Sequence, residues 1–170
     1  MPRRSACPGC CRRGRSGWTN SGPCPRWCGP PSSWRTRSHL SVPIPPGGAV
    51  LWGKGFEVDR AGSLPWLRDA EVRYWGDLDT HGFAILDRLR AWLPQTRSVL
   101  MDRQTLVEHR DRWVQDRAPT AARLTRLDAA EQSLYADLVT DRFGEGVRLE
   151  QERIDWAWAS ERLSAAASGC

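Results

Sequence analysis

The sequence predicts an α/β domain in which a parallel sheet is flanked by helices. Short apolar runs alternate along the chain with segments of helical periodicity, which is the order that builds such a sheet. The runs are bounded by turn residues and carry few charges, as strands buried on both faces do. They lie at 49–52 (AVLW), 71–75 (EVRYW) and 98–101 (SVLM). Three strands make a thin sheet, so we expect the first strand of the fold to be missing.

The composition divides the 170 residues into two parts. Residues 1–40 hold eight arginines, five of the six cysteines and no acidic residue, whereas the rest holds 17 basic and 20 acidic residues. The net charge of +5 therefore comes from the first 40 residues, and it is not by itself evidence of nucleic-acid binding. We expect residues 1–40 to be a separate segment and 41–168 to be the folded domain.

The segment 1–40 has neither helical nor strand periodicity, and three interpretations are open. Its Cys/Arg/Pro/Gly-rich, acid-free composition is typical of GC-rich DNA read out of frame, which favours a disordered segment. A zinc ribbon is the second interpretation, although few apolar residues are available to pack around a metal. Its zinc ligands would be four cysteines with tolerable spacing: Cys7, Cys10, Cys24 and Cys28. A basic arm that touches DNA is the third interpretation. We favour the first.

Membrane and export signals are absent from the sequence pattern. No apolar run approaches the length of a bilayer span, and no apolar region of a signal peptide follows Met1. We therefore expect a cytoplasmic protein.

The first part of the domain is predicted to alternate strands with short helical pieces. A proline-rich extended stretch at 41–47 leads into the strand at 49–52, and a glycine turn at 53–56 follows. A helical piece broken by Pro65 runs to about residue 70. After the strand at 71–75, an amphipathic helix starts near Gly82 and stops at Pro94. Its apolar positions are Phe83, Ile85, Leu86, Leu89, Trp92 and Leu93.

Three further helices are expected after the strand at 98–101. One begins at Asp102 and places Leu106, Val107, Trp113 and Val114 on one side. The next lies within 127–144, with Leu127, Ala130, Leu134 and Leu138 at helical spacing and a stop at Gly144. The charged segment VRLEQERI (147–154) leads into a final helix that contains Trp156 and Leu163.

Acidic residues follow two of the predicted strands. Asp77 and Asp79 come just after the strand at 71–75, and Asp102 follows the strand at 98–101. Ligands bind at the carboxyl ends of the strands in an open parallel sheet, so we expect these acids to share one edge. Alternation puts the carboxylates of Asp77 and Asp79 on one side, roughly 6–7 Å apart. Two such anions repel unless a cation lies between them, and Mg²⁺ prefers oxygen ligands.

Structural roles compete with the metal interpretation. Asp79 or Thr80 could cap the following helix, and Asp102 is still more typical of a helix cap. His81 is more often a turn or packing residue than a ligand. Glu150 and Glu152, which alternate with Arg148 and Arg153, favour a solvated charged face. Asp77 has no comparable structural role, and an arginine pair that left no room for an ion would contradict the metal interpretation.

The segment YWGDLDTHGFAILDRLRAWLP resembles the C-terminal, Toprim-like domain of the JetD family of Wadjet plasmid and phage defence. The stretches VPIPPGGAVLWGKGF, SVLMDRQTL, LYADL and VRLEQERI extend the resemblance over about residues 41–155. It implies a Toprim-type DNA endonuclease that depends on Mg²⁺ or Mn²⁺ and acts with an SMC-like complex. Asp77 and Asp79 would be the catalytic, metal-binding pair, with His81, Glu150 and Glu152 as supporting residues. DNA and the SMC-like Wadjet subunits are the implied partners, and a homodimer is one assembly that we consider.

One part of the family pattern is missing. The resemblance implies a glutamate at the end of the first strand, in a Val-Glu-Asn-Glu motif before the P-x-P-P stretch, but SSWRTRSHLSVPIPP contains no acid. If residues 33–38 are encoded TCG-TGG-AGA-ACG-AGG-TC, reading from the third base gives Val-Glu-Asn-Glu-Val. We therefore hypothesise a frameshifted start, with the frame regained near residues 38–39. A CGN codon for Arg35 would contradict this hypothesis.

Without that glutamate, the chain as written is expected to bind Mg²⁺ or Mn²⁺ weakly or not at all and to cut no DNA. The sheet is then an incomplete Toprim-like parallel sheet that lacks its first strand. Two other functions remain open. One is a non-catalytic subunit or remnant that docks on an SMC-like complex, and the other is a small zinc-ribbon DNA-binding protein.

Overall fold

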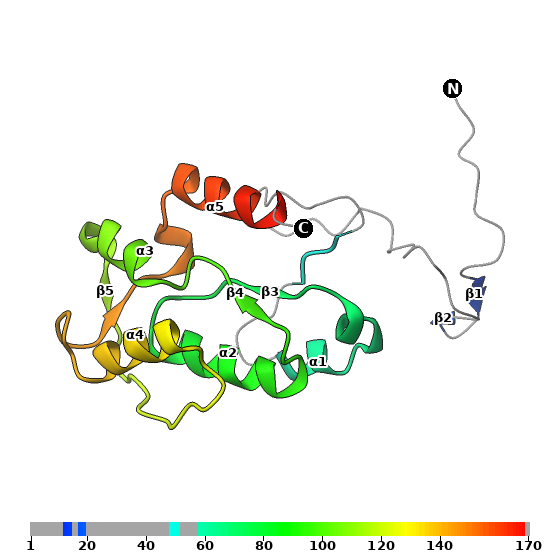
Figure 1. The fold of residues 1–170 in the computed structure, drawn as a ribbon, viewed down its shortest axis with the longest axis horizontal. Coiled ribbons are helices and arrows are strands. Elements are labelled where there is room, and N and C mark those ends of the chain that lie inside the picture. The colour runs from blue at the N-terminus through cyan, green and yellow to red at the C-terminus, as the bar shows by residue number, and fades with distance from the viewer. Residues whose placement is uncertain (1–11, 15–16, 20–47, 52–57, 169–170) are drawn as a thin grey trace. The chain divides into compact units, whose positions relative to one another are not determined.

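The computed structural model describes residues 12–14, 17–19, 48–51 and 58–168 (Figure 1). The chain divides into two units, Met1–Val50 and Leu51–Cys170. In the first unit, strands β1 (Arg12–Gly14) and β2 (Gly17–Thr19) pair antiparallel. This pair differs from the sequence prediction, which places no strand in residues 1–40.

Several predictions concern residues that the structure does not describe. The zinc-ribbon interpretation depends on four cysteines that all lie outside the described residues: Cys7, Cys10, Cys24 and Cys28. The proline-rich stretch at 41–47 and the glycine turn at 53–56 also lie outside them. The zinc-ribbon interpretation therefore stays a prediction.

The second unit is a mixed α/β structure, as predicted. Helix α1 (Val58–Gly62) and the 3₁₀ helix η1 (Pro65–Asp69) form the broken helical piece expected before residue 70. The remaining elements are β3 (Arg73–Tyr74), α2 (Thr80–Trp92), β4 (Arg97–Ser98), α3 (Arg103–Glu108), η2 (Arg110–Arg112), β5 (Val114–Gln115), α4 (Ala129–Val139), β6 (Val147–Arg148), η3 (Gln151–Arg153) and α5 (Trp156–Ser168). In the described part of the chain, none of the helices is long and apolar enough to cross a membrane.

Strands β3 and β4 form the predicted parallel pair, with Arg73 opposite Arg97 and Tyr74 opposite Ser98. The run at 98–101 leaves the sheet early because Leu100 has a φ of 63°, which lies outside the β region. The first predicted strand is wrong in its described part. Residues 49–51 have no regular structure, and Val50 and Leu51 are about half exposed, since no described strand pairs with them.

Helix α2 follows the predicted amphipathic pattern closely. Phe83, Leu86 and Leu89 are buried, as is Leu93 directly after the helix. Trp92 is the exception: it is 52% exposed, and its indole N–H donates to Asp59 Oδ1 at 3.1 Å. The helix therefore packs one apolar stripe of its surface into the core, and this packing fixes its N-terminus.

The helix predicted from Asp102 to Val114 is shorter in the structure. It ends at Glu108 because the buried His109 turns the chain, with its ring Nδ1 2.8 Å from the Thr105 carbonyl oxygen. A 3₁₀ turn and strand β5 follow, and β5 pairs antiparallel with β6. Val107, placed on the apolar side by the sequence, is 47% exposed. The structure thus adds an antiparallel pair that is not predicted.

One large core joins most of these elements. It contains residues from α2, α3, α4 and α5 together with Leu78 and Leu149, which lie on the two loops that meet beside β3. A smaller cluster packs α1 and η1 against the C-terminal half of α2. In Figure 1, β3 and β4 run between the layer of α1 and α2 and the helix α5. The segment that follows β3 is therefore anchored in the main core.

Candidate functional site

The two aspartates that the sequence singles out flank a core residue. Leu78 is fully buried, and its backbone exchanges two hydrogen bonds with Leu149: Leu78 N–H donates at 2.9 Å and Leu149 N–H at 3.1 Å. Side chains alternate along this extended segment, so that Asp77 and Asp79 lie away from the core side that Leu78 occupies. The carboxylate pair is thus positioned by core packing and by the backbone of residue 149.

Asp79 caps helix α2, which confirms the capping alternative. The Gly82 N–H donates to Asp79 Oδ1 at 2.6 Å, and the aspartate is only 2% exposed. Gly82 is required here because a Cβ at this position would lie 2.0 Å from the carbonyl oxygen of Asp77. The hydroxyl of Thr80 instead accepts from the Thr120 N–H at 2.8 Å. The cap uses one oxygen of Asp79 and leaves Oδ2 for other contacts.

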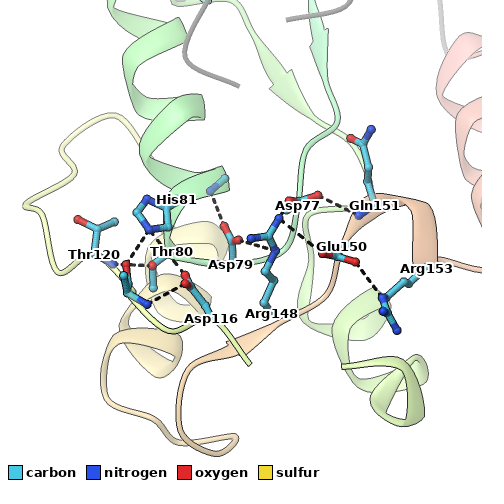
Figure 2. Close-up of polar contacts among 12 residues, drawn as sticks. Asp77, Asp79, Thr80, His81, Asp116, Thr120, Arg148, Glu150, Gln151 and Arg153 are labelled. Atoms are coloured by element: carbon cyan, nitrogen blue, oxygen red, sulfur yellow. Dashed lines mark hydrogen bonds and ion pairs between the residues drawn. The ribbon is translucent and has the colours of Figure 1, made fainter. Parts of the chain in front are cut away.

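The guanidinium of Arg148 lies between the two aspartates (Figure 2). Its Nη2 donates to Asp77 Oδ2 at 2.5 Å, and its Nε lies 3.3 Å from Asp79 Oδ2 as an ion pair. That Nε is buried and has no hydrogen bond. Arg148 is therefore in the position for which the sequence predicts a metal ion.

Asp77 has a structural contact that the sequence does not predict. Its Oδ1 accepts the Gln151 N–H at 3.0 Å, so that one oxygen is held by the start of η3 and the other by Arg148. The side chain is 26% exposed, against 2% for Asp79. The pair therefore consists of one buried and one accessible carboxylate.

The charges of the site act on one another. Burial raises the pKa of Asp79, and the Asp77 charge adds to this, while the Gly82 N–H and Arg148 oppose it. Burial disfavours the charged form of Arg148, but Asp77 and Asp79 outweigh it and raise the pKa of the guanidinium. Burial and the same two aspartates also raise the pKa of the Tyr74 phenol. The site thus has an excess of negative charge that Arg148 only partly balances.

The supporting residues proposed from the resemblance lie in different places. Glu150 Oε1 is 3.9 Å from Arg148 Nη2, and its other oxygen accepts from Arg153 Nε at 2.9 Å. Glu152 is exposed on η3. His81 Nε2 lies 2.8 Å from the Ala118 carbonyl oxygen and 3.7 Å from Asp116 Oδ2, on the other side of Asp79 in Figure 2. Only Glu150 is therefore close to the arginine that links the aspartates.

Asp102 does not join the aspartate pair through any contact in the described residues. Both of its oxygens bond to Thr105: Oδ1 accepts the backbone N–H at 2.8 Å, and Oδ2 accepts the hydroxyl at 3.0 Å. Asp102 is the cap of α3, as the sequence favours.

Sequence reasoning missed Arg148, and the interpretation of 148–154 as a charged solvated face needs correction at this residue. Arg148 is 34% exposed and bonds to an aspartate 71 residues away. The alternation of Val147, Arg148 and Leu149 is the signal that could have found it. Because Leu149 enters the core, Arg148 must leave the strand on the side of the aspartates.

The arrangement does not fit a divalent metal ion as it stands: the arginine pair named above as contradicting the metal interpretation is present at Asp77. The two oxygens that could meet at an ion, Asp77 Oδ2 and Asp79 Oδ2, both face the guanidinium. Within the described residues, no group of three or more His, Cys, Asp or Glu side chains is arranged to hold a metal. The cation that lies between Asp77 and Asp79 is the guanidinium of Arg148.

Comparison with known families gives one finding for this chain. The model of the family described as Wadjet protein JetD, C-terminal, matches residues 36–163, about three quarters of the 170 residues. The match includes the aspartate pair, Arg148 and Glu150, whereas Cys7, Cys10, Cys24 and Cys28 lie before it. No curated protein matches the chain.

Proposed function

The chain belongs to the family of Wadjet JetD C-terminal domains, and from this premise we propose that it is the Toprim-type nuclease domain of that defence system in a form that does not cleave DNA. The observation that carries the proposal is the convergence of Asp77 and Asp79 on one cation directly after β3. The carboxyl end of a parallel strand is where such sheets bind their ligands. The acidic pair is thus in the position that a metal-dependent nuclease needs.

We attribute the absence of cleavage to the missing glutamate together with the contacts that the two aspartates already make. Mg²⁺ sites use carboxylate oxygens that are free to coordinate. Here Asp79 is buried as a helix cap, Asp77 is bonded to Gln151 and Arg148, and the expected glutamate does not occur in the sequence before the P-x-P-P stretch. We propose that Mg²⁺ and Mn²⁺ bind weakly or not at all, so that no metal-dependent cleavage step is available.

A chain that does not cleave DNA could still act in the defence system by binding its other subunits. The family is a component of the Wadjet system, so we propose that its SMC-like subunits are the direct partners. The residues after 40 carry 17 basic and 20 acidic side chains, which disfavours strong binding to the phosphate backbone by this domain alone. DNA would then be reached through the complex, and a homodimer is the self-association to test.

A plasmid-nicking assay with Mg²⁺ or Mn²⁺ tests this function. We expect no cleavage by the chain as written. A chain expressed from a gene whose first 38 codons are read in the shifted frame should cut the plasmid, and Asp77→Ala in that chain should abolish the cutting.

Two outcomes would contradict the proposal. Efficient cutting by the chain as written, lost in Asp77→Ala, would show that the glutamate is not needed. A folded, frame-corrected chain that cuts no plasmid in the presence of its SMC-like partner would contradict the assignment to a nuclease domain.

A further inference from the structure

We propose that Arg148 is the resident cation of the aspartate pair and that it excludes divalent metal ions from this chain. The inference deepens the proposed function and rests on it in treating Asp77 and Asp79 as the remnant of a metal site. In the chain as written, which lacks the first-strand glutamate, the guanidinium takes the place of the ion. Removing the guanidinium should therefore create a divalent-cation site where the chain as written has none.

Each aspartate also has a hydrogen bond that does not involve Arg148. Asp77 Oδ1 is bonded to the Gln151 N–H, and Asp79 Oδ1 is bonded to the Gly82 N–H. Between them, Leu78 is fixed by its two backbone hydrogen bonds to residue 149. None of these contacts involves the guanidinium, so its removal leaves two fixed carboxylates, each with an Oδ2 that has lost its cationic partner.

The charge balance of the site favours a cation of higher charge than arginine. One guanidinium faces both Asp77 and Asp79, so one positive charge meets two negative ones, while Glu150, 3.9 Å from Arg148, has its own ion pair with Arg153. Two carboxylates that share a site without a cation repel one another, and the buried Asp79 is shielded from the water that would screen its charge. A divalent ion would balance the two aspartates, with water molecules as further oxygen ligands.

The contacts of Arg148 leave one of its hydrogen-bond donors unused. Its Nε is buried and makes no hydrogen bond, because its contact with Asp79 Oδ2 has the distance but not the geometry of one. Its side chain is 34% exposed, and its backbone belongs to β6, which pairs with β5. The guanidinium can therefore leave the aspartates toward solvent while the strand that carries it stays in place.

Mn²⁺ binding, measured by the loss of the free-ion signal in electron paramagnetic resonance, tests the inference. We compare the full chain with Arg148→Gln, which removes the charge and keeps much of the length, and with Arg148→Lys, which keeps the charge. Arg148→Gln should bind Mn²⁺ at least about tenfold more tightly, equivalent to about 1.4 kcal/mol. Arg148→Lys should remain as weak as the unchanged chain.

A matched double variant identifies the ligands. Arg148→Gln combined with Asp77→Asn should lose the gain, because the accessible carboxylate is gone. Adding Mg²⁺ should also raise the melting temperature of Arg148→Gln but not that of the unchanged chain, since an ion that binds only the folded state stabilises it.

Two results would overturn the inference. One is a folded Arg148→Gln chain, checked by circular dichroism, that binds Mn²⁺ no more tightly than the unchanged chain. The second is a gain in Mn²⁺ binding that persists after Asp77→Asn. None of these measurements uses DNA, so they are independent of the nicking assay that tests the proposed function.

Discussion

Arg90 and Arg148 both contact buried carboxylates, but their surroundings differ. Arg90 on α2 forms a two-point ion pair with Glu131 on α4, in which Nη2 donates to Oε1 at 2.9 Å and Nη1 donates to Oε2. Its remaining contacts are with backbone carbonyl oxygens, of Thr96 at 3.0 Å and of Arg126 at 2.8 Å. Both partners are nearly inaccessible, with 11% and 4% of their side chains exposed. The positive charge of Arg90 meets the single negative charge of Glu131, and each of the three guanidinium nitrogens donates a hydrogen bond.

Glu131 is equally well bonded on its own side. It accepts from the Ser98 hydroxyl at 2.6 Å and from the Asp128 N–H at 2.8 Å, as part of the capping box of α4. Burial acts to raise the pKa of Glu131, but the hydrogen bonds from Arg90 and Ser98 outweigh it, and the pKa is lowered overall. This ion pair joins α2 to α4, and its charges balance one another.

The Arg148 site has the opposite character. Two aspartates share one guanidinium, its buried Nε makes no hydrogen bond, and the buried Asp79 has a raised pKa. The comparison teaches that burial of an ion pair does not by itself indicate function. The Arg148 site, with two acids on one guanidinium and an unused donor, is the one at which we propose that the cation can be exchanged, whereas the Arg90–Glu131 pair stabilises the fold.

The largest expected effect is the loss of the Arg90–Glu131 pair. Arg90→Ala leaves Glu131 buried without its partner, which should cost about 3–5 kcal/mol of unfolding free energy in urea denaturation. Replacing both residues, as in Arg90→Met with Glu131→Leu, should recover part of that loss because no buried charge remains, although the Ser98 hydroxyl and the Asp128 N–H lose their acceptor. If the single and double variants were equally destabilised, the pair would not be the structural element that we describe.

A smaller effect is expected at the Asp79 cap. Asp79→Ala removes the acceptor for the Gly82 N–H and should cost about 1 kcal/mol, whereas Asp79→Asn keeps a cap acceptor and should cost much less. Thermal unfolding of the two variants measures the difference. Equal losses in both variants would mean that the charge facing Arg148, rather than the cap, accounts for the contribution of Asp79.

The smallest effects are expected in the pH dependence of stability, where the two acids have opposite signs. The folded-state pKa of Glu131 lies below its ordinary value of 4.5, so its contribution is present above that value and is lost as the pH falls through the folded pKa. The folded-state pKa of Asp79 lies above its ordinary value of 3.8, so its contribution is present below 3.8 and is lost as the pH rises through the folded pKa.

Urea denaturation across the acidic range separates the two contributions. Glu131→Gln should reduce the loss of stability on acidification, and Asp79→Asn should reduce the loss on raising the pH from about 4. Slopes that change in the same direction in both variants would contradict the assigned signs.

The features that could be predicted from the sequence are local. The apolar spacing of α2, its stop before Pro94 and the caps at Asp79 and Asp102 each depend on residues within one or two turns. The parallel pairing of β3 and β4 follows from the helix between them. The aspartate pair was singled out for the same reason, because strand and helix signals meet between residues 76 and 82.

The features that were missed depend on contacts between distant residues. Strands β5 and β6 are two residues long, too short to show a period, and they pair across the whole of α4. Arg148 reaches Asp77 over 71 residues, and Arg90 reaches Glu131 over 41. An arginine in a charged segment has the same local pattern whether it faces water or a buried acid, so only the folded chain distinguishes the two.

The positions of the two aspartates depend on the packing of Leu78, an apolar residue of the core. This wholly enclosed side chain is the single residue between the two carboxyl groups, and its main chain is tied to Leu149, the neighbour of Arg148. A change of volume at Leu78 would therefore shift both anions and the arginine together. Hydrocarbon packing in the interior thereby sets the spacing of charges at the rim.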